Sequence, residues 1–140
     1  MRPAILATFT LSRASPCQAQ TAPDFSGVWW NERCSKMEFV KSADQIAGSY
    51  TSALGKSAGT PFPLIGYQIG DLIAFTVNFG ATGALTSWAG QNTVERGVEK
   101  FVTMWHLAAN IPDSDEEQVL FSTVWTGSDV FVRAKPGHCP

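Results

Sequence analysis

The chain has no long stretch with helical periodicity, and short β-prone runs recur along almost its whole length. We count about eight such runs, each bounded by turn-forming residues such as Gly, Pro, Asn, Asp and Ser. The runs cover residues 27–34, 36–41, 45–52, 63–69, 72–79, 84–92, 100–108 and 122–134. Short turns join several of them, which is typical of consecutive antiparallel hairpins. The sequence therefore predicts an all-β fold, an eight-stranded antiparallel up-and-down barrel.

Length and charge narrow the classes of function. A chain of 140 residues fits one domain with one core, and we place the barrel domain at residues 24–136. The formal net charge is −2, and only 16% of the residues are charged. Nucleic-acid binders usually carry a basic surface that neutralises phosphates. A polynucleotide partner is therefore not expected.

The first residues differ in composition from the rest of the chain. Arg2 precedes an apolar run over residues 4–11, and small and polar residues follow up to Ala19. This pattern resembles a secretory signal peptide at residues 1–19, and the alternatives are a disordered start or a misassigned start codon. No later run approaches the roughly 18 apolar residues that span a bilayer. We expect a secreted or periplasmic protein that does not enter a membrane.

The three cysteines, Cys17, Cys34 and Cys139, form no CxxC pair and show no metal-ligand spacing. A zinc or other metal site is therefore not expected. If Cys17 leaves with the signal peptide, Cys34 and Cys139 remain and could pair in an oxidising compartment. The predicted barrel places Cys34 near its open end and Cys139 after a strand that runs toward its closed end. We therefore expect free or intermolecular thiols rather than a bridge within the chain.

Side chains alternate between the two faces of a strand, so the parity of each run predicts the barrel interior. One face mixes large aromatic residues with polar ones: Trp29, Asn31, Tyr50, Ser52, Phe75, Val77, Phe79, Thr86, Trp88, Thr103, Trp105, Leu107, Asp129 and Phe131. Taken singly, each is as well explained as a core, turn or cap residue. Together they place many buried polar groups in one interior, which predicts a polar ligand. His106 has the opposite parity and is predicted to lie on the surface or at a subunit contact.

Several segments along this interior carry a family resemblance. Residues 27–35 read G-x-W-x-N-x-x-x-S, and residues 50–52 read Y-x-S before a small-residue loop. The further matching segments are residues 75–79, 86–91, 105–107 and 127–131. In this order and spacing they resemble the strands of the avidin and streptavidin family, and the match runs from about residue 25 to residue 133.

The resemblance implies high-affinity, non-covalent binding of biotin inside the barrel, with biotin sequestration as the family-level role and biotin as ligand rather than cofactor. The ureido oxygen would accept hydrogen bonds from Asn31, Ser35 and Tyr50, and the ureido N–H groups would donate to Ser52 and Asp129. Thr86 would face the sulfur. The implied aromatic and apolar walls are Phe79, Trp88, Trp105, Leu107 and Leu54. The implied carboxylate and loop positions are Gly55, Lys56 and Ala84. The family also implies a homodimer or homotetramer.

Some positions depart from the family pattern. Phe121, or Leu120 if the alignment slips by one residue, stands where the family commonly has a Trp that covers a neighbouring subunit's pocket. This change favours a dimer over a tightly coupled tetramer and predicts tight but sub-maximal affinity. Ala84 replaces a Ser, and Phe79 replaces a Trp, which narrows the aromatic wall. Lys56 follows the small-residue loop and could place a positive charge near the biotin carboxylate.

Two other classes of function compete with biotin binding. A lipocalin-like barrel that carries another small molecule would need a mainly aliphatic interior, which the polar residues contradict. A hydrolase or isomerase could use Asp129 and Tyr50 as acid and base. The sequence has no nucleophile elbow, no His–carboxylate pair and no Gly-rich phosphate loop to support it. We therefore predict a binding protein without enzymatic activity.

Overall fold

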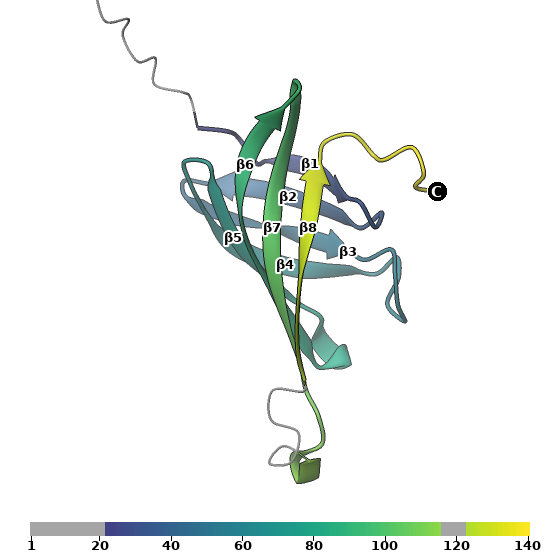
Figure 1. The fold of residues 1–140 in the computed structure, drawn as a ribbon. Coiled ribbons are helices and arrows are strands. Elements are labelled where there is room, and N and C mark those ends of the chain that lie inside the picture. Colours follow the sequence, from purple (N-terminus) through teal and green to yellow (C-terminus); the bar gives the residue numbers. More distant parts are fainter. Residues whose placement is uncertain (1–21, 116–122) are drawn as a thin grey trace, which may run out of the picture.

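The computed structural model describes residues 22–115 and 123–140, and it is a closed antiparallel barrel in which each strand pairs with its neighbours in sequence (Figure 1). The strands are β1 (Gly27–Asn31), β2 (Lys36–Ser42), β3 (Gln45–Thr51), β4 (Pro61–Ile69), β5 (Leu72–Asn78), β6 (Ala84–Glu95), β7 (Val98–Ala109) and β8 (Val124–Val132). Two short 3-10 helices, η1 (Gly80–Thr82) and η2 (Asp113–Asp115), lie in the connections after β5 and β7. The predicted fold class is confirmed. The predicted signal peptide and Phe121 lie outside the described residues.

Burial along the strands follows the predicted alternation. Trp29, Tyr50 and Trp88 are buried, whereas their neighbours in sequence are partly or fully exposed. The prediction for His106 is also confirmed, because this residue is exposed on the outer face of β7. In the part of the chain that the structure describes, no helix has the length and apolar character needed to cross a membrane.

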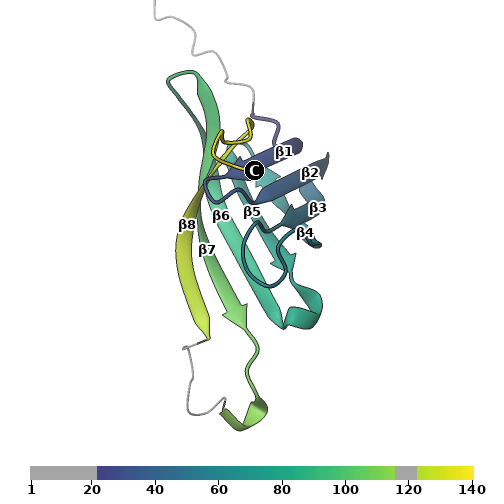
Figure 2. The ribbon, with the colours of Figure 1, turned by 90° about the vertical axis from the view of Figure 1, so that its right-hand side faces the viewer.

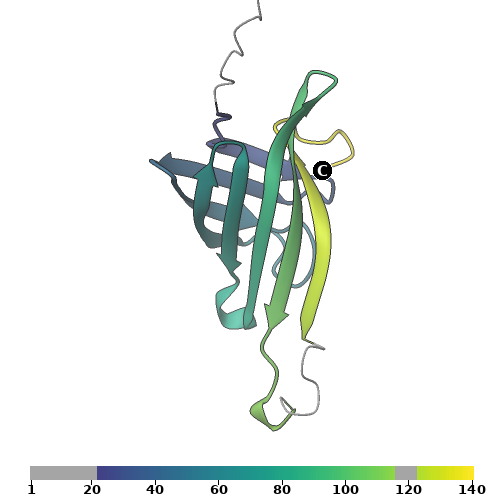
Figure 3. The same cartoon turned by 60° about the vertical axis from the view of Figure 1, so that its left-hand side comes forward.

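The hairpin of β6 and β7 is longer than the sequence predicts. Arg96 and Gly97 form its turn with φ of 52° and 79°, and positive φ at both central residues matches the twist of antiparallel strands. The ladder therefore continues to the pair Glu95–Val98. Figures 2 and 3 show this hairpin turn projecting beyond the rest of the barrel, while the connection that carries η2 extends from the opposite end.

Aromatic side chains fill one end of the barrel. Phe101 stacks on Phe131 with ring centroids 4.7 Å apart, and Trp29 meets the edge of Phe101 at 4.7 Å. Phe25, which precedes β1, covers Trp29 and accepts the indole N–H at its backbone oxygen over 2.7 Å. The guanidinium of Arg133 lies 3.7 Å from the centre of the Trp29 ring. This end of the barrel is closed by its own side chains.

The barrel closes where β1 meets β8, and this seam has a strong stagger. The ladder consists of Trp30–Val132 and Asn31–Phe131, so the last residue of β1 lies beside the end of β8 rather than at its start. Staggered register is how a sheet closes into a barrel. The stagger brings the β1–β2 turn close to the C-terminal tail.

The expectation of free or intermolecular thiols was wrong. Cys34 in the β1–β2 turn and Cys139 in the C-terminal tail form a disulfide, with their Cα atoms 5.4 Å apart. The expectation failed because it assigned the two cysteines to opposite ends of the barrel. Strand direction alone does not reveal the β1–β8 stagger, which lets the tail fold back from β8 onto the turn (Figure 1).

Candidate functional site

The open end of the barrel holds a cavity of about 630 Å³. Most of the residues predicted for the site line it: Asn31, Ser35, Tyr50, Ser52, Leu54, Lys56, Phe79, Ala84, Thr86, Trp88, Trp105, Leu107 and Asp129. Gly55 does not belong to the lining, and Phe121 lies outside the described residues. The predicted interior therefore divides into an aromatic closed end and a hollow open end.

Three lining residues were missed by the sequence analysis: Arg33, Ser57 and Thr82. Arg33 lies inside the predicted run 27–34 and has the same parity as Asn31, so following the alternation to the end of that run would have found it. Ser57 and Thr82 lie in loops, where no alternation reveals which side chains face inward.

Asn31 reaches the cavity from the end of β1, and its own turn fixes its orientation. Its Oδ1 atom accepts the backbone N–H groups of Arg33 at 3.1 Å and Ser35 at 2.8 Å. These bonds close the turn, which is the usual role of Asn in a tight connection. They also identify the amide oxygen and leave the Nδ2 hydrogens as donors on the cavity side. Asn31 is 2% exposed, so these donors are sheltered from solvent.

Ser35 and Tyr50 add two hydroxyl groups beside Asn31. The Ser35 Oγ atom accepts the backbone N–H of Ala53 at 3.2 Å, which leaves its hydrogen available for donation. Burial raises the pKa of the Tyr50 hydroxyl above its ordinary value, although hydrogen bonding with Ser35 opposes the rise. Tyr50 therefore keeps its proton at neutral pH. The three side chains present donors to the same end of the cavity.

Asp129 faces these donors from β8. Its Oδ2 atom accepts the indole N–H of Trp88 at 2.8 Å, a bond that sequence parity could not foresee. Burial raises the pKa of the Asp129 carboxyl, the Trp88 bond opposes that rise, Glu32 adds to it, and Arg33 and Asn31 oppose it. Asn31 also hydrogen-bonds to this carboxylate, and the lone pairs that remain can accept a hydrogen bond from a ligand. The polar end of the cavity thus combines converging donors with one strong acceptor.

Ser52 and Thr86 differ in how their hydroxyl groups are satisfied. The Ser52 Oγ atom donates to the Leu54 backbone oxygen at 2.9 Å and accepts the Leu54 N–H at 3.1 Å. Its oxygen retains one lone pair for a further donor. The Thr86 Oγ1 atom is buried and has no hydrogen-bond partner among the described residues. A buried hydroxyl without a partner costs about 1–3 kcal/mol, so Thr86 marks a place that favours a ligand atom.

Aromatic rings form the walls between the polar end and the mouth. Tyr50 lies 5.3 Å from Trp88 and 6.0 Å from Phe79 between ring centroids, and Phe75 stacks beneath Trp88 at 5.2 Å. Trp105 packs against Gly127 of β8, where an added Cβ would collide with the indole ring. These contacts hold the rings in place before any ligand arrives.

The mouth of the cavity carries apolar and basic side chains. Leu54 and Lys56 reach it from the β3–β4 loop, and both are exposed. Trp125 has the parity of Asp129 and pairs in register with Leu107. Its side chain is exposed beyond the lining. The mouth can therefore accept a ligand with an apolar stem and an anionic end.

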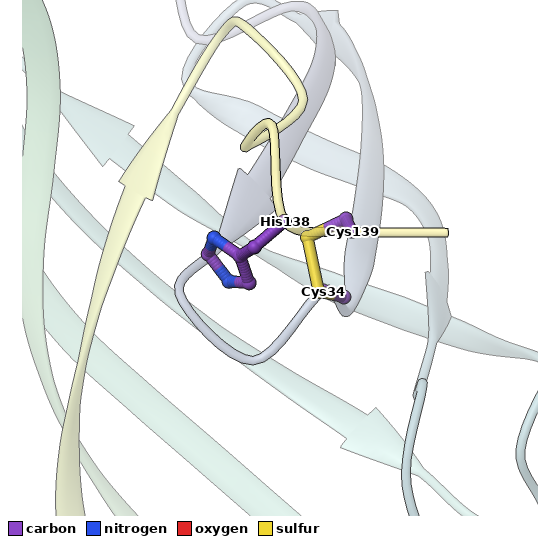
Figure 4. A group of neighbouring side chains, drawn as sticks. All are labelled: Cys34, His138 and Cys139. Carbon is purple, nitrogen blue, oxygen red and sulfur yellow. A yellow bond between two sulfur atoms is a disulfide. The ribbon is translucent and has the colours of Figure 1, made fainter.

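Cys34, His138 and Cys139 form a separate cluster outside the cavity (Figure 4). Their potential ligand atoms lie within 4.8 Å of one another. Metal binding by cysteine requires a thiolate, and here the two sulfur atoms are bonded to each other. In this form the cluster is a structural link between the β1–β2 turn and the tail.

Comparison with known proteins identifies relatives that share this architecture. The profile of the Avidin family matches residues 19–134. Afifavidin from Afifella pfennigii is 34% identical over an alignment of 128 residues, and the match covers 86% of this chain and 76% of that protein. The family profile spans all the residues that line the cavity.

Solved structures give the same result in three dimensions. Xenavidin superposes with a TM-score of 0.71 at 27% identity, covering 81% of this chain and 99% of its own. Short afifavidin in complex with biotin gives a TM-score of 0.62 at 31% identity, with coverages of 79% and 89%. Rhizavidin in complex with biotin gives 0.64 at 26% identity, with coverages of 85% and 95%.

Proposed function

The chain belongs to the avidin family, and from this premise we propose that it binds biotin non-covalently in the cavity at the open end of its barrel. The observation that carries the proposal is the convergence of three buried donors, from Asn31, Ser35 and Tyr50, opposite the acceptor Asp129. The biotin complexes of short afifavidin and rhizavidin support it. Sequestration of biotin is the role we propose for this binding.

The ureido group of biotin fits the polar end. Its oxygen would accept hydrogen bonds from the Asn31 amide and from the Ser35 and Tyr50 hydroxyls. The bonds that these side chains make within the protein leave their donor hydrogens available to the ligand. Its N–H groups would donate to Ser52 and to the free oxygen of Asp129. A carboxylate acceptor in a dry site forms shorter and stronger bonds than a neutral one. Specificity for a ureido group follows from this donor and acceptor order.

The remainder of the ligand would lie along the walls and the mouth. Thr86 would turn its unpaired hydroxyl to the sulfur, while aromatic and apolar side chains would enclose the rings and the start of the acyl chain. These enclosing residues are Phe79, Trp88, Trp105, Leu107 and Leu54. A preformed aromatic wall loses little conformational entropy on binding.

Lys56 would pair with the biotin carboxylate at the mouth, beside the Gly55 and Ala84 positions. The ammonium group is exposed, so we expect replacement of Lys56 by Ala to weaken binding of free biotin only a few-fold. Biotin amide has no carboxylate and serves as the control ligand, whose affinity should not change. Equal affinities of both proteins for free biotin would remove this contact from the proposal.

We propose a binding function rather than an enzymatic one. Asn31 and Asp129 are held by hydrogen bonds from the Ser35 backbone N–H and the Trp88 indole N–H, and the donor and acceptor order of the polar end matches recognition of a neutral, planar ureido group. A carrier of an apolar molecule, the lipocalin-like alternative, would leave the Asn31, Tyr50 and Asp129 groups unpaired at a cost of about 1–3 kcal/mol each. Retention on biotin-agarose that free biotin abolishes would distinguish these classes.

The outer face of β4–β7 supports self-association, and we assign it to a second copy of this chain as a homodimer or homotetramer. Exposed apolar side chains gather there: Ile65, Tyr67, Ile69, Leu72, Val102 and Met104. Met104 is 63% exposed and lines two hollows on this face. We expect Met104→Glu to lower the mass seen by sedimentation to that of a monomer. Thr60→Glu, which adds the same charge in the exposed β3–β4 loop outside this face, should leave the mass unchanged.

Secretion or export to the periplasm is the localisation we propose. The Cys34–Cys139 disulfide supports it, because such bonds persist mainly in oxidising compartments. Expression of the full chain and N-terminal sequencing of the exported product would test both the localisation and cleavage near Ala19.

Titration calorimetry with biotin tests the central proposal. We expect a dissociation constant below about 1 µM and a change in tryptophan fluorescence, because Trp88 and Trp105 line the cavity. Millimolar affinity would overturn the proposal. The Phe121 position lies outside the described residues, so its effect on affinity and oligomeric state stays a prediction.

A further inference from the structure

The polar end of the cavity spans the seam where the barrel closes. Asn31 ends β1, whereas Asp129 lies on β8, two residues before the Phe131 that pairs with Asn31. The β1–β8 ladder is the shortest among the described strands. The donors and the acceptor of the proposed ureido site therefore lie on opposite sides of the β1–β8 seam, where few backbone pairs hold the two strands together.

The β1–β2 turn on one side of this seam has an unfavourable backbone. Cys34 has a φ of 66°, in the left-handed region that a residue with a Cβ seldom adopts. The turn is closed by bonds to Asn31, including the Cys34 N–H donated to the Asn31 backbone oxygen at 3.1 Å. The same turn supplies Asn31, Arg33 and Ser35 to the cavity. A change in this turn would move several ligand-facing groups together.

The C-terminal tail supports the turn from outside the cavity (Figure 4). Cys139 is bonded to Cys34, and a ring nitrogen of His138 lies 3.0 Å from the Glu32 backbone oxygen. The Glu32 carboxylate in turn accepts the Val130 N–H of β8 at 2.9 Å. Turn, tail and β8 are thus connected beyond the end of the ladder.

We infer that the Cys34–Cys139 disulfide and the His138 contact act as a clamp that holds the ureido-binding turn against β8. Cys34, Cys139 and His138 are then positioning residues, since none of them lines the cavity. The inference rests on the proposed binding of biotin. The clamp keeps Asn31 and Ser35 at the spacing from Asp129 that the ligand requires, so its loss should act mainly on the lifetime of the complex.

The test compares the wild-type chain with a double variant, Cys34→Ser and Cys139→Ser, by stopped-flow and chase kinetics with biotin. We expect dissociation to become about tenfold faster while association changes little, because affinity differences within one site are mostly differences in dissociation rate. Wild-type protein treated with a phosphine should match the variant, because the phosphine reduces the disulfide to two thiols and becomes a phosphine oxide, with water supplying the oxygen and the two hydrogens. The variant itself should not respond to phosphine.

A control separates positioning from general stability. Ile73→Ala removes a buried side chain of β5 outside the cavity and should lower the melting temperature without changing the dissociation rate. Circular dichroism would establish that each protein is folded at the assay temperature. Dissociation that accelerates in Ile73→Ala as much as in the double cysteine variant would show that only stability matters and would overturn the clamp.

Hydrogen exchange tests the clamp without ligand. The amides of Arg33 and Ser35, which donate to Asn31, should exchange faster in the double cysteine variant or after phosphine treatment, whereas amides of β5 should not. Unchanged exchange in the turn would overturn the inference, whatever biotin does. Failure of the oxidised wild-type protein to bind biotin would instead overturn the proposed function, so the two failures are distinguishable.

Discussion

The two ends of the barrel interior are built from the same strands with the same alternation, yet they solve the problem of burial differently. At the closed end, Trp29 donates its N–H to Phe25 and packs against Phe101. Gln68 at this end donates from Nε2 to the Pro23 backbone oxygen, and its buried Oε1 atom is the one side-chain polar atom there without a partner among the described residues. At the open end, Asn31 and Asp129 each make hydrogen bonds within the protein and keep further donor or acceptor capacity for a ligand. The difference shows which half of the interior was shaped for stability and which for a ligand.

The largest expected effect concerns the closed end. Phe101 is fully buried between Trp29 and Phe131, and Phe101→Ala should lower the free energy of unfolding by about 3–5 kcal/mol through the cavity it leaves. Urea denaturation would measure this loss. The folded fraction should bind biotin with affinity within about threefold of the wild type, since a distant core substitution usually acts independently. A large loss of biotin affinity in the folded variant would contradict the division into a stabilising closed end and a ligand-binding open end.

The next effect concerns the acceptor of the open end. Asp129→Asn removes a charge-assisted hydrogen bond worth about 1.5–3 kcal/mol, so the dissociation constant for biotin should rise about ten- to hundredfold. The free energy of unfolding should change little or increase at neutral pH, because the wild-type protein must bury a carboxylate. Calorimetry and urea denaturation on the same samples would measure both. A variant that loses stability but not affinity would assign Asp129 to the core.

Acid should weaken biotin binding at the open end by protonating Asp129. Burial raises the pKa of Asp129 above the ordinary 3.8, so the folded protein holds this proton more tightly than the unfolded chain. The contribution of Asp129 to stability is therefore fully present below pH 3.8 and declines as pH rises through the folded pKa. Biotin affinity should change in the opposite direction, because the ligand needs the ionised carboxylate. Calorimetry as a function of pH should show this rise in the wild type and a flat profile in Asp129→Asn.

The smallest expected effect concerns the Thr86 hydroxyl, the buried group at the open end that has no partner among the described residues. Thr86→Val removes a buried group that has no partner among the described residues, so the free energy of unfolding should increase by about 1 kcal/mol while biotin affinity falls a few-fold. Thr103→Val is the matched control, because the Thr103 hydroxyl donates to the Asp129 backbone oxygen at 3.1 Å. That variant should lose stability. Equal losses of stability in both variants would mean that Thr86 is satisfied within the protein.

Much of the interior could be predicted from sequence because alternation along a strand is a local property. The parity of Tyr50, Thr86 and Trp88 fixed their side of the sheet before any partner was known. Parity could not divide that side into a packed end and a hollow one, since this depends on which rings meet across the barrel. It also could not reveal the bond between Trp88 and Asp129, whose residues are 41 positions apart.

By itself, the sequence determined an eight-stranded meander with one polar and aromatic interior, because periodicity and turn residues act over a few neighbouring positions. Only the tertiary structure decided how the barrel closes. The stagger between β1 and β8 sets Asn31 beside Phe131 and carries Cys139 back to Cys34, so the pocket and its clamp share one seam. Register between the first and last strands is a collective result of every strand between them, and no local pattern encodes it.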